Sequence, residues 1–155
     1  MHIARRLTLT LAVGAGALGL IAMPATALAT PQRVLMPNCT PKVHPDFAHM
    51  SRTPNQVSAH AYWTRGTCTK ASVGTVLVYL QEKKNGKWVM EGHEGIAVDM
   101  LPGKIKLSLR PNARGTCGSK TKTEWRSVGI VRVNANGDNG NNQSTTKEQD
   151  LPCHI

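Results

Sequence analysis

The stretch VGTVLVYLQEKKNGKWVM, residues 73–90, carries the strongest local fold signal in the sequence. Its first part, residues 73–81, is rich in β-branched residues, which favour strands. Asn85-Gly86 then separates this run from the apolar residues at 87–90. Asn-Gly between two such runs is typical of a tight hairpin, because both residues tolerate the positive φ angles of a type I′ turn. The sequence therefore predicts an antiparallel hairpin here.

Alternation with a period of two recurs outside the hairpin, as expected for strands that bury one face. Val57, Ala59, Ala61 and Trp63 alternate with Ser58, His60, Tyr62 and Thr64. The apolar runs at 96–100 and 125–133 predict further strands, with a bulge expected at Gly129. The glycine-flanked segment 91–94 is expected to form an exposed turn. The sequence contains no convincing amphipathic helix.

About seven short strands with regularly spaced turn signals predict an all-β fold, an antiparallel β-sandwich that is immunoglobulin-like in the loose sense. Trp63, Trp88 and Trp125 are expected to face its core. A small closed barrel is the alternative. The segment NANGDNGNNQSTTKEQD, residues 134–150, has almost no apolar content and is predicted to be a mobile loop.

The N-terminus has the organisation of a secretory signal peptide. Arg5 and Arg6 precede an apolar run, and Ala27-Leu28-Ala29 is a small-residue cleavage site. We therefore expect residues 1–29 to be a signal peptide, 30–38 an extended arm, and 39–155 a disulfide-stapled domain. The apolar run ends at Pro24 and small residues, and no second run is long enough for a membrane span. The predicted location is extracellular.

An even number of cysteines in an exported chain predicts two disulfides. The four cysteines allow three connectivities, of which we favour Cys39–Cys68 with Cys117–Cys153, because each bridge then ties neighbouring segments. Two of them lie in identical Arg-Gly-Thr-Cys tetrapeptides, at 65–68 and 114–117. We interpret both copies as structural corners between strands, with their cysteines committed to the bridges.

The charge of the chain predicts acidic partners. Removal of Arg5 and Arg6 leaves 17 basic residues against 9 acidic ones, so the net charge falls from +10 to +8. Ile105, Leu107 and Leu109 alternate with polar residues and predict a strand. Its opposite face would carry the candidates for an anionic surface site, Lys104, Lys106 and Arg110. A solvated edge strand would have the same pattern.

The arm is the other candidate site. It contains two prolines and the residues Arg33, Val34, Leu35 and Met36. An extended apolar segment of this kind can add to the edge of a partner's sheet or fill its cleft. An N-terminal strand of the domain's own fold is the alternative.

No motif predicts catalysis or a cofactor. The sequence contains no G-x-S-x-G, no H-E-x-x-H and no C-x-x-C, and the cysteines are assigned to disulfides. The histidines are scattered, which does not favour a metal site. We therefore expect a non-enzymatic protein with no metal, no cofactor and no specific nucleic-acid partner.

The order of motifs resembles a known group. An arm precedes Cys39, a strand ends in Tyr-Trp before Cys68, and Gly-Lys-Trp at 86–88 is followed by a Pro-Gly turn, Cys117, Thr-x-Trp-Arg at 123–126 and Leu-Pro-Cys. This layout resembles small secreted two-disulfide sandwich proteins of actinobacteria. It is similar to the small adaptor subunit of umbrella-type antibacterial toxin particles, which links a lectin-like subunit to the repeat ring of the toxin subunit through an extended N-terminal segment. The resemblance implies that residues 30–38 dock into a partner.

Three functions are compatible with these features. The first is a secreted protein-binding module, an adaptor that links subunits of an extracellular antibacterial toxin complex. The second is a secreted inhibitor of a protease or another hydrolase, which has the same size and disulfide plan. The third is a binder of an anionic cell-wall polymer, and such binding would weaken steeply with salt.

Overall fold

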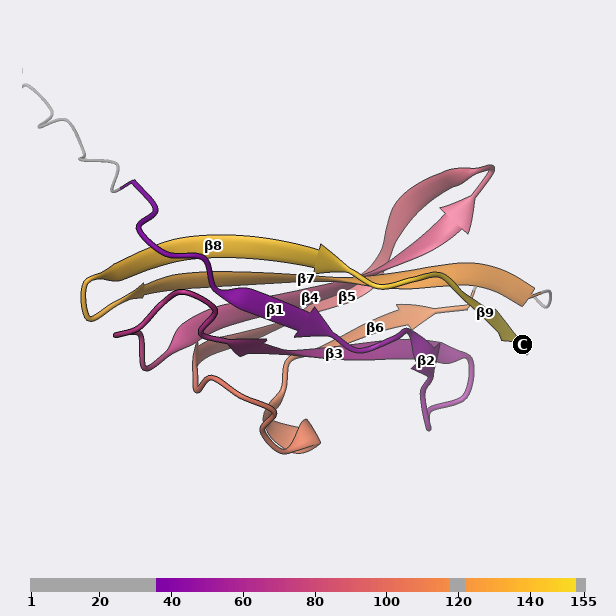
Figure 1. Cartoon of the computed structure of the whole chain (residues 1–155). Helices are drawn as coiled ribbons and strands as arrows, with labels where there is room; N and C mark the ends of the chain where they lie inside the picture. The colour runs from indigo at the N-terminus through magenta and orange to yellow at the C-terminus, as the bar shows by residue number, and fades with distance from the viewer. Residues whose placement is uncertain (1–35, 118–121, 153–155) are drawn as a thin grey trace, which may run out of the picture. The chain divides into compact units, whose positions relative to one another are not determined.

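The computed structural model describes residues 36–117 and 122–152. The predicted signal peptide, residues 30–35 of the arm and Cys153 lie outside these residues. The described strands are β1 (Lys42–Pro45), β2 (His49–Met50), β3 (Gln56–Thr64), β4 (Gly74–Lys84), β5 (Lys87–Met100), β6 (Asn112–Thr116), β7 (Lys122–Ala135), β8 (Asp138–Thr145) and β9 (Gln149–Pro152) (Figure 1). All their pairings are antiparallel, so the all-β prediction is confirmed.

The strands follow one hydrogen-bonded path in the order β1-β3-β6-β5-β4-β7-β8, with β2 added to β3 and β9 to β7. The two ends of the path come together, because β1 lies beside β8 (Figure 1). The Asn38 and Cys39 amides, just before β1, donate hydrogen bonds to the Asn139 carbonyl at 2.8 and 3.2 Å. The sheet is therefore nearly barrel-shaped, and the immunoglobulin-like sandwich is not confirmed.

Strand β5 joins the two halves of the path, and it corrects the prediction of a turn at 91–94. It is a strand through this segment, but its pairing with β4 shifts register between Glu91 and Gly95, and His93 pairs with Arg114 of β6. A Cβ at Gly92 would lie 1.9 Å from the Arg114 carbonyl oxygen, and the φ of Gly92 is +76°. Only glycine permits this approach, which lets β5 pass from one neighbour to the other.

The core forms where inward side chains of β3 and β4 meet. Val57, Ala59, Ala61 and Trp63 of β3 are all 0% exposed, which confirms the predicted alternation. The facing residues of β4 are Val76, Val78 and Leu80. Trp63 also donates from Nε1 to the Met100 carbonyl at 2.8 Å, so its one polar atom is satisfied.

Trp125 is buried in this core with Trp63, but the core position predicted for Trp88 is wrong. Trp88 is half-buried and pairs with Lys83, on the opposite face of β4 from Leu80. Gly129 is also not a bulge, because the β4–β7 register is regular through Val78 and Gly129. A Cβ there would lie 2.8 Å from the Val43 side chain, so the glycine makes room for β1.

The hairpin predicted around Asn85-Gly86 is confirmed. Lys84 pairs with Lys87, and Asn85 and Gly86 have φ angles of 51° and 74°. These values belong to the left-handed region that a type I′ turn requires. The turn stands away from the neighbouring strands (pink in Figure 1).

The segment 134–150 is not a loop, contrary to prediction. Asn136-Gly137 forms a second turn, with φ angles of 55° and 87°, and β8 pairs with β7 from Asp138 to Thr145. Strand β9 then pairs with the start of β7. Low apolar content misled the prediction, because β8 is held mainly by hydrogen bonds and by close backbone packing.

The predicted strand at 104–110 is also absent. Residues 107–109 form a 3-10 turn, with Lys106 and Arg110 at its ends. Leu107 and Leu109 are 53% and 63% exposed, so the alternation of this segment does not reflect a buried face. Its geometry is set instead by Arg110, whose Nε and Nη2 donate to the Ile105 carbonyl at 3.0 and 2.9 Å.

The two Arg-Gly-Thr-Cys copies differ in structure. The first is a corner, as predicted, in which Gly66 has a φ of 59° and Cys68 is bonded to Cys39. The second lies within and just after strand β6, so its interpretation as a corner is wrong. Cys117 is not a free thiol, and its predicted partner Cys153 lies outside the described residues, so that pairing stays a prediction.

Candidate functional site

Of the arm residues predicted to bind a partner, the structure describes only Met36. Arg33, Val34 and Leu35 lie outside the described residues, while Met36 is 87% exposed. The chain becomes attached to the domain immediately afterwards, because the Asn38 side chain donates to the Gly137 carbonyl at 2.8 Å. The docking role of the arm stays a prediction.

The three candidates for an anionic surface do not share one strand face. Lys104 and Lys106 are exposed in an irregular segment. The Arg110 guanidinium points inward, where its Nη1 lies 3.0 Å from Asp46 Oδ2 and its centre lies 4.9 Å from the Tyr62 ring centroid. Its side chain is 7% exposed, so Arg110 organises the loop. Binding of an anionic polymer by this segment stays a prediction.

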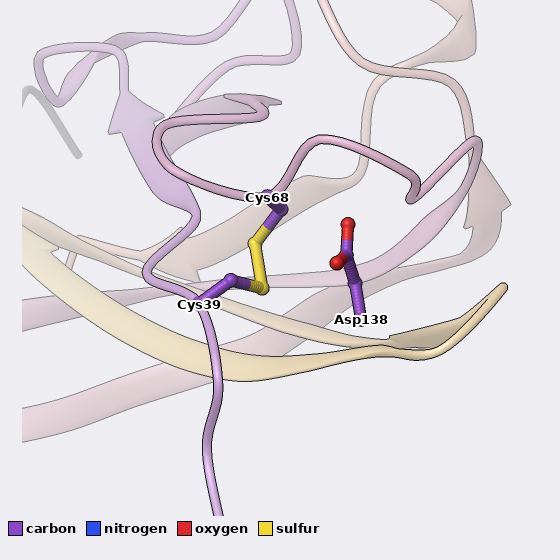
Figure 2. A group of neighbouring side chains, drawn as sticks. All are labelled: Cys39, Cys68 and Asp138. Carbon is purple, nitrogen blue, oxygen red and sulfur yellow. A yellow bond between two sulfur atoms is a disulfide. The ribbon is translucent and has the colours of Figure 1, made fainter.

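Figure 2 shows the one cluster of possible metal-binding side chains among the described residues, which comprises Cys39, Cys68 and Asp138. Both sulfur atoms are consumed by the disulfide, and thiolates are the form that binds metal. Asp138 Oδ2 accepts the backbone N–H groups of Lys70 and Ala71 at 2.6 and 2.7 Å. The cluster therefore has a structural role.

One candidate surface lies on the outward side of strands β5, β4 and β7. Because Val76, Val78 and Leu80 point into the core, Leu77 points outward. Leu77 pairs with Ile96 on one side and Ile130 on the other. We name this surface the outer apolar face, consisting of Leu77, Met90, Ile96, Val98 and Ile130. Met90, Ile96 and Val98 are 56%, 55% and 69% exposed, which is unusual for residues of this size on one strand.

Trp88 borders the outer apolar face and is fixed by two cations. The Arg126 guanidinium lies 4.2 Å from the Trp88 ring centroid, and Lys83 Nζ lies 5.6 Å from it. Arg126 is itself oriented by a 2.7 Å hydrogen bond from its Nε to Gln81 Oε1. Cation–π contacts of this kind hold an aromatic ring in one orientation at the surface. Two further exposed cations, Lys87 and Arg132, form no ion pair among the described residues.

A second candidate is a cleft of about 620 Å³ on the outward side of β2, β3 and β6, covered partly by the 3-10 turn. We call it the histidine cleft. The side chains that matter below are His49 on β2, Ser58 and His60 on β3, Asn112 and Arg114 on β6, and Leu107 on the turn. The register brings them together, because Ser58 pairs with both His49 and Arg114, and His60 pairs with Asn112.

The hydrogen bonds of His49 identify its tautomer. Its Nδ1 lies 3.0 Å from the Phe47 carbonyl oxygen, which can only accept, so Nδ1 carries the hydrogen. Its Nε2 lies 3.2 Å from Ser58 Oγ and, in the neutral ring, accepts the hydroxyl hydrogen. A serine and a histidine are thus paired, but a carbonyl replaces the carboxylate that stabilises an imidazolium in hydrolases.

His60 lies beside His49, with ring centroids 5.9 Å apart and planes nearly parallel. Burial lowers the pKa of His60 below its ordinary value of 6.5, and the nearby charges of His49, Arg110 and Arg114 lower it further, while Asp46 acts in the opposite direction. The Nδ1 atom of His60 and the Oδ1 atom of Asn112 are buried without a hydrogen-bond partner in the described part of the chain. Such atoms are rare, because an unpaired buried polar atom is costly.

Sequence reasoning missed the histidine cleft. The alternation in β3 does place Ser58, His60 and Tyr62 on one face, which is a detectable signal. Their partners come from β2 and β6, and His49 lies next to His60 only because two short strands add to β3. No local pattern predicts that pairing.

The comparisons do not assign a family. No family model, no curated protein and no solved structure matches this chain. Within residues 36–117 and 122–152, no helix is long and apolar enough to cross a membrane.

Proposed function

We propose that this chain is a secreted, non-enzymatic protein-binding domain, and that a partner protein docks on the outer apolar face. The observation that supports this proposal is the exposure of Ile96 and Val98 on β5, where Ile96 is in register with Leu77 and Leu77 with Ile130. Each exposed large side chain that a partner covers contributes about 1.5–3 kcal/mol. The row of Ile96, Leu77 and Ile130 across three strands, together with Val98, therefore supplies the centre of an interface.

The charge around this face specifies the partner's chemistry. Arg132 is exposed two residues along β7 from Ile130, and Arg126 presents a guanidinium above Trp88. A complementary surface has an apolar centre and an acidic rim. The excess of basic residues over the whole chain acts in the same direction.

The role of an adaptor between subunits of an extracellular antibacterial toxin complex is part of this proposal. It is supported by the motif order that resembles such adaptors and by the exposure of Met36 at the end of the arm. An adaptor has to bind two partners, and the arm and the outer apolar face are separate segments of the chain.

The test is recovery of the partner from culture supernatant with the tagged protein. Ile96→Lys places a charge in the centre of the outer apolar face and is expected to abolish recovery. Thr69→Lys adds the same charge at an exposed site away from this face and should retain the partner. Equal recovery with both variants would refute docking on this face.

A deletion of residues 30–38 separates the two parts of the proposal. If the arm holds one toxin subunit, its deletion removes that subunit while the partner of the outer apolar face remains. Recovery of no large partner by either form would exclude the adaptor role. Stoichiometric inhibition in a panel of proteases and glycosidases would instead favour the inhibitor function.

A further inference from the structure

The histidine cleft has the features of a binding site that the outer apolar face does not explain. Its residues lie on the outward side of β3, whereas the outer apolar face lies on the outward side of β4. The inward sides of these two strands meet in the core. The cleft and the outer apolar face are therefore on opposite sides of the core and can be occupied independently.

The first feature of the cleft is unpaired positive charge. Arg114 lies directly opposite Ser58 and is exposed, and Arg52 also lines the cleft. Neither arginine forms an ion pair among the residues that the structure describes. Arg110, in contrast, is already neutralised by Asp46. A guanidinium without a partner at the edge of a cleft is suited to bind a carboxylate or a phosphate in bidentate geometry.

The pair of buried atoms without partners does not select the ligand. Asn112 Oδ1 and His60 Nδ1 are closed to solvent, so a ligand in the cleft does not reach either atom. The groups that select a charged ligand are therefore the exposed arginines, Arg52 and Arg114.

The second feature is an apolar wall. Met50 and Leu107 line the cleft, and Leu107 is 53% exposed in the absence of a ligand. The cleft has no Trp, Tyr or Phe in its lining, so it lacks the rings on which nucleic-acid bases stack. Negative charge and apolar groups occur together along an extended acidic polypeptide.

We propose that the histidine cleft binds an extended acidic segment of a polypeptide, with carboxylates on Arg114 and Arg52 and the chain lying against Leu107. His49 and Ser58 form the floor, held in one arrangement by their hydrogen bonds to Phe47 and to each other. This pre-organisation lowers the cost of ordering the site on binding. The inference does not rest on docking at the outer apolar face.

The test uses NMR signals of the His49 and His60 rings in the purified, disulfide-bonded protein. The probe is acetyl-tetraglutamyl amide, and the uncharged control is acetyl-tetraglutaminyl amide. Saturable shifts of both rings are expected with the glutamyl peptide and not with the glutaminyl peptide. Absence of shifts, or equal shifts with both peptides, would overturn the proposal.

Matched variants distinguish the cleft from general attraction to a basic protein. Arg114→Gln should weaken binding at least tenfold, whereas Lys87→Gln, an exposed cation on the β4–β5 hairpin, should change it less than twofold. Both residues are exposed, so both variants are expected to fold. Equal weakening by the two variants would show a non-specific charge effect. Ile96→Lys should leave peptide binding unchanged, so failure of this proposal and failure of docking at the outer apolar face are separable.

Small anions identify the source of the carboxylate. Sodium glutarate and sodium phosphate should bind more weakly than the glutamyl peptide, because neither covers Leu107 and Met50 while it binds the arginines. Equal affinity for glutarate or phosphate would replace the polypeptide with a small-anion ligand and overturn the proposal. A bound carboxylate should also raise the pKa of His60 in a ring-signal titration, since negative charge favours the protonated ring. An unchanged titration at saturation would place the peptide elsewhere.

Discussion

Two hairpins of this protein turn through the same dipeptide, yet different interactions hold their strands. The β4–β5 turn at Asn85-Gly86 and the β7–β8 turn at Asn136-Gly137 have nearly the same φ angles. Strand β4 buries Val76, Val78 and Leu80, whereas β8 has the sequence DNGNNQST and no apolar side chain. The two hairpins therefore have the same type of turn, but different interactions stabilise their strands.

Polar contacts stabilise β8, whereas burial of apolar side chains stabilises β4. Asp138 accepts two backbone N–H groups from the segment that follows Cys68, and Asn142 donates to the Pro41 carbonyl at 2.9 Å. A Cβ at Gly140 would lie 2.2 Å from the Cys39 carbonyl oxygen, so only glycine lets the chain cross so closely. Each of these contacts joins β8 to one of the two segments that the Cys39–Cys68 disulfide links.

The largest effect is expected from removal of that disulfide. It closes a loop of sequence separation 29, and the double variant Cys39→Ala/Cys68→Ala should lose about 3–4 kcal/mol of unfolding free energy. Urea unfolding measures the loss, and hydrogen exchange locates it. Amides of 140–145 should exchange much faster, while those of 76–80 keep most of their protection. Equal loss of protection in both hairpins would show that they are stabilised by one shared set of contacts.

Asp138→Ala should have the next largest effect, about 2–3 kcal/mol, because it leaves two backbone N–H groups without their acceptor. Asp150→Ala is the matched control, since Asp150 is an exposed carboxylate on β9 and should change stability by less than about 0.5 kcal/mol. Thermal or urea unfolding of both variants measures the difference. If Asp138→Ala is as stable as the control, hydrogen bonding does not hold β8.

Glycine substitutions separate turn effects from strand effects. Gly140→Ala forces β8 away from the Cys39 carbonyl and should cost about 2 kcal/mol. Gly86→Ala and Gly137→Ala meet no atom within 4 Å and lose only a favoured left-handed conformation, which costs about 1–2 kcal/mol at each turn. The two turn variants should therefore match each other in urea unfolding. A large difference between them would mean that the turns are not equivalent.

Acidification should change the free energy of unfolding least, and this change should not arise in either hairpin. The pKa of His60 is lowered in the folded protein, mainly by burial, so folding favours the neutral ring. Stability is then complete above the unfolded-state pKa of about 6.5 and declines as the pH falls through that value towards the folded-state pKa. His60→Asn should remove this decline in urea unfolding measured from pH 8 to 5. An unchanged pH dependence would assign it to another group.

The local sequence pattern was sufficient to predict the strands that bury apolar side chains at regular spacing. Residues 57–64 and 73–90 were predictable because alternation and an Asn-Gly turn are properties of the segment itself. The same reasoning misplaced Trp88, since alternation distinguishes two faces of a strand but does not say which one meets the core. It also predicted a strand at 104–110, where Arg110 instead binds the Ile105 carbonyl and Asp46.

The candidate sites were less predictable than the fold. The outer apolar face requires the pairing of Ile96 with Leu77 and of Leu77 with Ile130, which come from three strands. The histidine cleft requires β2 and β6 to flank β3. The sites predicted from sequence, the arm at 30–38 and the basic residues at 104–110, were chosen from contiguous segments, and contiguity does not report which side chains meet.

The sequence by itself determined an all-β chain, its two strongest strands and the first hairpin, because each depends on residue type and short spacing. It allowed three disulfide connectivities, and the structure shows the Cys39–Cys68 bridge. Tertiary structure decided that DNGNNQST is a strand, since its partners are the Pro41 carbonyl and the Lys70 and Ala71 amides, far away in the chain. It also decided that the sheet nearly closes, which depends on β1 meeting β8. Hydrogen bonds between polar side chains and distant backbone groups leave no periodic signal in sequence, whereas burial of alternate side chains does.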